Sequence, residues 1–192
     1  MATKPGERKL QILQTLAEML QKPQGEKITT AALAARIGVS EAALYRHFAS
    51  KAQMFEGLIE FIEQTLFGLI NKITAEEQSG VKQMEAILPL LLGFARKNPG
   101  MTRVLIGDAL VNEDDRLQAR INQLQDRLEA TLKQSLRIAA SQGEIPAGVD
   151  AAAQANLIMC YVVGRWHQYA KSGFKREPME HWQAQWQALV AA

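Results

Sequence analysis

Residues 28 to 51 have the sequence ITTAALAARIGVSEAALYRHFASK, which predicts two short helices joined by a tight turn. Either Thr29 or Thr30 can cap the first helix, because a threonine hydroxyl accepts a hydrogen bond from an amide of the first turn. Gly38 permits the positive φ that ends this helix, and Ser40 can cap the second helix. These caps around a glycine turn predict a helix-turn-helix, whose second helix lies in the major groove of DNA.

The second helix of this motif has an inward and an outward side. Leu44 and Phe48 face inward, which leaves the other side available to bases and flanking phosphates. Ser50 opens a third helix, in which Gln53 completes a capping box. Lys51 lies at the positive end of that helix, where a phosphate oxygen is bound well. The residues of the second helix that stay available to DNA are Glu41, Ala42, Tyr45, Arg46 and His47.

The charge of the chain is distributed unevenly. Residues 1–51 contain eight Lys and Arg against four Glu, a net charge of +4. The whole chain carries +2, so residues 52–192 carry −2. A basic head on a slightly acidic body suits a protein that contacts nucleic acid at one end only.

Several patterns that would indicate another class of protein are missing from the sequence. Cys160 is the single cysteine, so no intramolecular disulfide can form. The segment MATKPGERK has no apolar run typical of a signal peptide, and the longest apolar stretch, residues 86–95, is too short to cross a bilayer. We therefore expect a cytoplasmic protein that does not enter a membrane.

Catalysis and cofactor binding are not predicted either. The sequence has no Ser/His/Asp set, no glycine-rich phosphate loop and no metal-ligand spacing. Cys160 and His167 are seven residues apart on one helix, but no further ligand is near them in the sequence. We expect no enzyme activity, no metal and no cofactor.

The apolar residues recur with helical spacing along nearly the whole chain, which predicts an all-α protein of about nine helices. A three-helix head would occupy residues 1–53, and its first helix would end at Pro23 and Gly25. A larger body of about six helices would occupy residues 54–192. The helices predicted for the body span residues 54–73, 81–97, 102–110, 114–140, 151–171 and a last segment that begins at Pro178.

The last two predicted helices carry more apolar side chains than the end of a monomer easily buries. Two such helices from each of two protomers can form a four-helix bundle, so we expect a homodimer. A satellite of the monomer core is the alternative. A two-fold dimer also presents two recognition helices to two half-sites of DNA. The residues assigned to dimerisation are Leu157, Tyr161, Trp166, Trp182 and Trp186.

The head resembles the TetR family of DNA-binding regulators, whose signature is similar to GVSEAALYRHFASK at residues 38–51. The segments FIE at 61–63, LLLGFARKNPG at 90–100 and DRLQARINQL at 115–124 are similar to the nucleoid-occlusion members of that family. This resemblance implies a TetR-like all-α homodimer on palindromic double-stranded DNA, associated with the nucleoid, with one or more dimers per site. By position, it implies DNA contacts at Thr29, Thr30, Ser40, Ala42, Tyr45, Arg46 and His47, with Lys51 on phosphate.

The resemblance also implies a protein partner. Nucleoid-occlusion members bind the cell-division GTPase FtsZ when they are on DNA and antagonise its polymers over the nucleoid. Two positions depart from the family pattern: Lys97 replaces an arginine, and Leu69 stands where a basic residue is usual. The residues that match the FtsZ-binding surface are Phe61, Leu69, Leu90, Gly93, Lys97 and Asn98.

A ligand-responsive TetR-type repressor is the alternative function. In such a protein a small molecule binds a pocket in the body and moves the two heads apart. The presence or absence of a pocket with placed polar groups therefore discriminates the two functions. Phe61 and Gly93 also have simpler interpretations, as a core residue and as a site of close helix approach.

Overall fold

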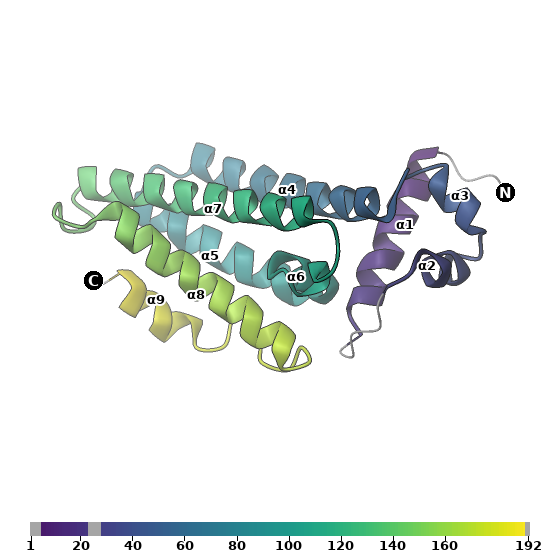
Figure 1. Ribbon diagram of the computed structural model, residues 1–192. Helices are drawn as coiled ribbons and strands as arrows, with labels where there is room; N and C mark the ends of the chain where they lie inside the picture. The colour runs from purple at the N-terminus through teal and green to yellow at the C-terminus, as the bar shows by residue number, and fades with distance from the viewer. Residues whose placement is uncertain (1–4, 23–27, 191–192) are drawn as a thin grey trace. The chain divides into compact units, whose positions relative to one another are not determined.

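The computed structural model describes residues 5–22 and 28–190 and is shown in Figure 1. Every regular element in these residues is helical, which confirms the all-α prediction. In chain order the elements are α1 (Pro5–Leu20), α2 (Thr30–Ile37), α3 (Glu41–Tyr45), α4 (Lys51–Glu76), α5 (Gly80–Lys97), α6 (Pro99–Leu105), the 3₁₀ turn η1 (Asp108–Leu110), α7 (Asp115–Ser141), α8 (Ala151–Lys171) and α9 (Trp182–Val190).

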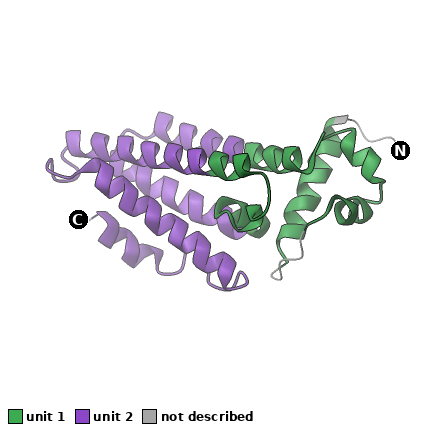
Figure 2. Cartoon of the chain, viewed as in Figure 1, with its two compact units in different colours: residues 1–62, 98–121 green, residues 63–97, 122–192 purple. Residues whose placement is uncertain are grey.

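The chain divides into two compact units, which Figure 2 shows in green and purple. Unit 1 is Met1–Ile62 with Asn98–Ile121, and unit 2 is Glu63–Lys97 with Asn122–Ala192. Helices α4 and α7 each contribute to both units. This grouping places α6, η1 and the first turns of α7 with the head, so the boundary after residue 53 stays a prediction.

Unit 1 is built around the three predicted head helices. Leu16 of α1, Leu33 of α2 and Leu44 of α3 are all buried, as is Phe55 at the start of α4. Each comes from the apolar side of its helix, so burial follows the sequence periodicity. The core of the head therefore fixes the orientation of α3.

Helix α6 attaches to the end of α1 through backbone groups. A Cβ on Gly100 would lie 1.9 Å from the carbonyl oxygen of Ala17, so the two backbones approach too closely for any side chain. Arg103 donates hydrogen bonds to the carbonyls of Leu20 (3.1 Å) and Lys22 (3.2 Å). A cation at the C-terminal end of a helix is favourable, because the unsatisfied carbonyls there carry partial negative charge.

In unit 2, α8 packs against α5. The side chains of Gln83 and Ser135 hydrogen-bond at 2.8 Å within the core. A Cβ on Gly80 would lie 2.1 Å from the Ser135 carbonyl, so α5 begins in backbone contact with α7. The near-heptad leucines of α7 in this unit are all buried: Leu124, Leu128, Leu132 and Leu136.

Three predicted helix ends differ from the structure or fall outside it. The helix predicted at residues 102–110 begins earlier, at Pro99, because proline suits the first helical position. The last helix begins at Trp182 rather than at Pro178. Arg165 explains this delay: it donates to the carbonyls of residues 177, 178 and 180 at 2.7–3.0 Å, which holds them in a turn. The predicted end of the first helix at Pro23 and Gly25 lies outside the described residues.

Candidate nucleic-acid interface

The helix-turn-helix of unit 1 has the caps that the sequence predicts. The hydroxyl of Thr29 accepts from the amide of Ala32 at 3.1 Å, and the hydroxyl of Ser40 accepts from the amide of Ala43 at 3.2 Å. Gly38 has a φ of 77° and its amide donates to the end of α2. Both hydroxyls serve as acceptors in these bonds, so each keeps its own proton for another partner.

Helix α3 is short, and the residues after it form a turn. Arg46 and His47 follow the last helical residue, Tyr45, and the amide of His47 donates to Leu44 at 2.9 Å. Tyr45 is 45% exposed, and Arg46 and Ala42 are also exposed, whereas His47 is half-buried. The outward side of the motif is therefore open, as expected for a surface that meets DNA.

A chain of hydroxyl groups connects α2 with α3. The Tyr45 hydroxyl donates to Thr30 at 3.5 Å, and the Thr30 hydroxyl donates to a carboxylate oxygen of Glu41 at 2.5 Å. Because a threonine has one hydroxyl proton, Thr30 cannot donate to a phosphate while it holds Glu41. This pairing was not predicted, since it joins residues eleven apart on two helices.

Lys51, the predicted phosphate contact, forms an ion pair within unit 1. Half of the predicted capping box forms, because Ser50 accepts from the amide of Gln53. The Gln53 side chain accepts from the amide of Ala49 rather than from that of Ser50. The Lys51 ammonium pairs with Glu113, which precedes α7, and lies 5.7 Å from the centre of the Phe55 ring. No local pattern could indicate this partner, because it lies 62 residues away in the sequence.

Two of the residues assigned to the partner surface lie in unit 1 and four in unit 2. Phe61 is 38% exposed, so it is not the core residue that its apolar helix suggests, and Asn98 is half-buried at the start of α6. In unit 2, Leu69 is 46% exposed, Leu90 is half-buried and Lys97 is exposed. Gly93 completes the set. A Cβ added there would meet no atom within 4 Å, so a glycine at this position is not required for helix packing in the protomer.

The residues assigned to dimerisation divide into core and surface. Trp166 is fully buried and donates its indole N–H to the Leu91 carbonyl at 3.1 Å. It is therefore a core residue of unit 2, which corrects its assignment to the dimer surface. Trp182 and Trp186 stack at 5.5 Å and are each only 8% exposed. Leu157 is 51% exposed, and Tyr161 is half-buried with its hydroxyl donating to Gln185 at 2.9 Å.

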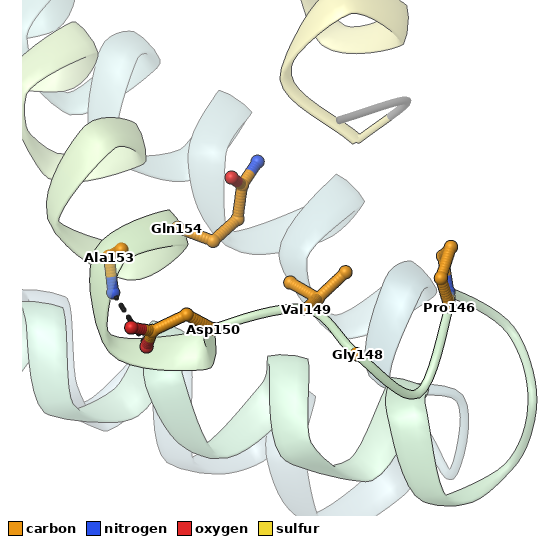
Figure 3. Close-up of a pocket in the computed structure, with 6 residues that line it drawn as sticks. All are labelled: Pro146, Gly148, Val149, Asp150, Ala153 and Gln154. Atoms are coloured by element: carbon orange, nitrogen blue, oxygen red, sulfur yellow. Dashed lines mark hydrogen bonds between the residues drawn. The ribbon is translucent and has the colours of Figure 1, made fainter.

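A hollow of about 380 Å³ lies where the loop after α7 meets the start of α8. Figure 3 shows the residues that line it. Its polar side chains are already engaged. Asp150 accepts from the amides of Ala152 and Ala153, which lowers the pKa of its carboxyl, and Gln154 donates to the carbonyl of Leu189. The hollow therefore offers apolar contact but few placed polar groups for a specific ligand. The lining residues are Pro146, Gly148, Val149, Asp150, Ala153 and Gln154.

Comparison with known proteins identifies the family. Residues 12–58 match the family described as bacterial regulatory proteins, tetR family, and residues 78–192 match the SlmA-like family described as tetracyclin repressor-like, C-terminal domain. The chain is 54% identical to the nucleoid occlusion factor SlmA of Alteromonas mediterranea, over 98% of this chain and 96% of that protein. It is 52% identical to SlmA of Idiomarina loihiensis over the same shares. The chain belongs to the SlmA family of nucleoid occlusion factors.

Solved structures show that the SlmA family shares its fold with other TetR regulators. A TetR transcription regulator from Haloarcula marismortui superposes with a TM-score of 0.81 over 97% of each chain, at 16% identity. The regulator FadR from Bacillus subtilis, solved in complex with stearoyl-CoA, superposes with a TM-score of 0.77 at 15% identity, over 95% of this chain and 97% of that one. At these identities the likeness concerns the fold alone.

Metal binding and membrane insertion find no support in the part of the SlmA-family chain that the structure describes. Those residues contain no group of three or more His, Cys, Asp or Glu that could hold a metal ion. Among the same residues, no helix is both long enough and apolar enough to span a bilayer. The thiol of Cys160 is exposed and lies 3.8 Å from the side-chain oxygen of Asn156.

Proposed function

We propose that this protein binds palindromic DNA as a homodimer through α2 and α3 and, while bound, binds FtsZ through exposed residues of α4 and α5. The observation that carries the proposal is the capped helix-turn-helix, in a chain that belongs to the SlmA family. In such motifs the second helix enters the major groove and its flanking donors contact phosphates.

The DNA contacts follow from the free donors of this motif. Thr29 and Ser40 keep their hydroxyl protons, and Arg46 is exposed directly after α3. An arginine at this place can form a bidentate pair with a guanine edge, which contributes about 1–3 kcal/mol of discrimination between bases. Lys51 contributes a phosphate contact that does not depend on the base sequence.

The outward side of α8 supports the dimer. Leu157, Cys160 and Gly164 follow one another at helical spacing on this side, and all three are exposed in the protomer. Small residues beside an exposed leucine allow a second helix to approach closely. On α9, Ala184 and Ala188 are exposed with the same spacing. We assign the interface to these two helices, with Leu157 as its apolar anchor.

Exposed apolar side chains on α4 and the half-buried Leu90 on α5 support the partner surface. Phe61 and Leu69 are among the few large apolar residues that the described protomer leaves exposed. On α5, Leu90, Gly93 and Lys97 are spaced three and four residues apart and share one face of the helix. An apolar face with a cation at one end fits a peptide segment that combines apolar and acidic residues.

Co-sedimentation with purified FtsZ polymers, with and without operator DNA, tests the proposal. Leu90→Glu and Lys97→Asp should abolish co-sedimentation and leave DNA affinity unchanged, because an unpaired charge and a reversed charge both disfavour association. Lys82→Asp, at an exposed position near the other end of α5, is the matched control and should bind normally. Leu69→Arg, which restores the basic residue usual in the family, should strengthen binding or leave it unchanged.

Two results would count against this function. Wild-type protein that ignores FtsZ even with operator DNA present would remove the partner from the proposal. Release from DNA on addition of a small metabolite would favour the ligand-responsive repressor instead. The hollow beside α8 does not by itself support that alternative, because Asp150 caps the helix and Gln154 donates to the Leu189 carbonyl.

A further inference from the structure

The ion pair between Lys51 and Glu113 is partly removed from solvent. The lysine side chain is 22% exposed and the glutamate side chain 14%. The ammonium also lies over the ring of Phe55, which favours a cation on its face. This pair is therefore stronger than an ordinary surface pair, because water screens it less.

Glu113 is held by the loop that carries it. Its amide donates to the carbonyl of Leu110 at 2.9 Å, and Asn112 before it has a φ of 65°. At the other end of the loop, Asp108 accepts from Arg103 at 2.7 Å. The carboxylate is thus presented to Lys51 from a structured turn in the same unit.

We propose that Glu113 competes with the DNA phosphate for Lys51 and thereby lowers the DNA affinity of this protein. The proposal rests on the assignment of Lys51 as a phosphate contact under the proposed function. To reach a phosphate, the ammonium has to leave Glu113, or else bring two anions close together. Either event opposes binding to any DNA sequence, since a phosphate contact carries no base information.

The dependence of affinity on salt distinguishes this competition from a structural role. A lysine that neutralises a phosphate releases a bound cation and contributes about 0.9 to the slope of log K against log salt. When Lys51 leaves Glu113, that carboxylate gathers a cation in turn, so the net release is small. Lys51 should therefore contribute little to the slope in the wild type and nearly the full amount once Glu113 is neutral.

The test is a double-mutant cycle on the full chain, with Glu113→Gln, Lys51→Ala and the double variant. Fluorescence anisotropy with a labelled duplex of mixed sequence gives the affinity across a series of KCl concentrations. Glu113→Gln should tighten binding about two- to five-fold at low salt, the size expected for loss of a partly exposed ion pair. It should also steepen the salt slope by about 0.9. Both effects should vanish in the Lys51→Ala background.

Asp115→Asn is the matched control, because it removes one negative charge two residues further along the same segment. It should change affinity less than Glu113→Gln does and leave the slope unchanged. Equal effects of the two variants would mean that net charge alone is responsible, which overturns the proposal. Circular dichroism checks that Glu113→Gln folds. If it folds poorly, Glu113→Asp takes its place, because it withdraws the carboxylate by one methylene. Its DNA affinity should lie between that of the wild type and that expected for Glu113→Gln.

Two further outcomes separate the inference from the function on which it rests. If Lys51→Ala weakens binding and Glu113→Gln does not tighten it, Lys51 contacts phosphate but Glu113 does not compete. If Lys51→Ala changes nothing in the Glu113→Gln background, Lys51 is not a phosphate contact, and that part of the proposed function is wrong. Weaker binding by Glu113→Gln would show that the glutamate positions Lys51 for DNA, the opposite of the proposal.

Discussion

Leu157→Glu should convert the dimer to monomers without unfolding the protomer. Leu157 is 51% exposed in the protomer, so about half of its side chain is left for an interface to bury. Full burial of a leucine contributes about 1.5–3 kcal/mol, so half contributes about 0.7–1.5 kcal/mol, and two-fold symmetry doubles this to about 1.5–3 kcal/mol. The glutamate adds an unpaired charge in each protomer, at about 1–3 kcal/mol or more.

These contributions together raise the dissociation constant of the dimer about a hundred-fold or more. Size-exclusion chromatography with multi-angle light scattering, over a dilution series, measures the shift. Trp166→Phe is the control, because Trp166 is fully buried and donates to Leu91 within the protomer. It should lower protomer stability by about 1–3 kcal/mol and leave the dimer intact. A Leu157→Glu protein that stays dimeric on dilution would refute the α8 interface.

Three further predictions concern unit 1 and the start of α8. Gly100→Ala should destabilise the protein by about 1–3 kcal/mol or more in urea unfolding, because the new Cβ meets a carbonyl of α1, whereas Gly93→Ala, in open space, should not destabilise it. Glu41→Ala should tighten binding to mixed-sequence DNA about two- to five-fold, since it removes a carboxylate from the recognition surface and frees the Thr30 hydroxyl; unchanged affinity would contradict this. Asp150→Ala should lower the melting temperature above pH 4 and have no such effect in stronger acid. The pKa of the Asp150 carboxyl is lower in the folded protein than its ordinary value of 3.8. The charged cap therefore stabilises the fold above pH 3.8, and this stabilisation is lost as the pH falls through the lowered pKa.

Local signals in the sequence predicted the head well. The caps at Thr29 and Ser40 and the glycine turn at Gly38 depend on residues within a few positions of one another, so a short segment contains all the information. The same holds for the start of α8, which Asp150 caps from the adjacent position. The DNA contacts assigned to these elements stay predictions.

The features that the sequence did not predict depend on contacts between segments that are far apart in the chain. Arg165 delays the start of α9 through three carbonyls that lie in a later loop, and nothing near Pro178 signals this. Trp166 reaches the backbone of α5 from 75 residues away, so periodicity alone could not separate core from interface on α8. The partners of Lys51 and Thr30 were missed for the same reason.

The attachment of α6 to α1 has a consequence for how heads of this family can vary. Arg103 contacts the backbone carbonyls of Leu20 and Lys22, and Gly100 meets the backbone of Ala17, so neither contact depends on the side chains of α1. Glu18, the exposed residue on the last turn of α1, can therefore change without weakening the attachment, whereas Ala17 and Leu20 are buried and have to stay small or apolar. A head with a different operator preference could be grafted onto this scaffold, provided that Gly100 and Arg103 and these two buried side chains are kept.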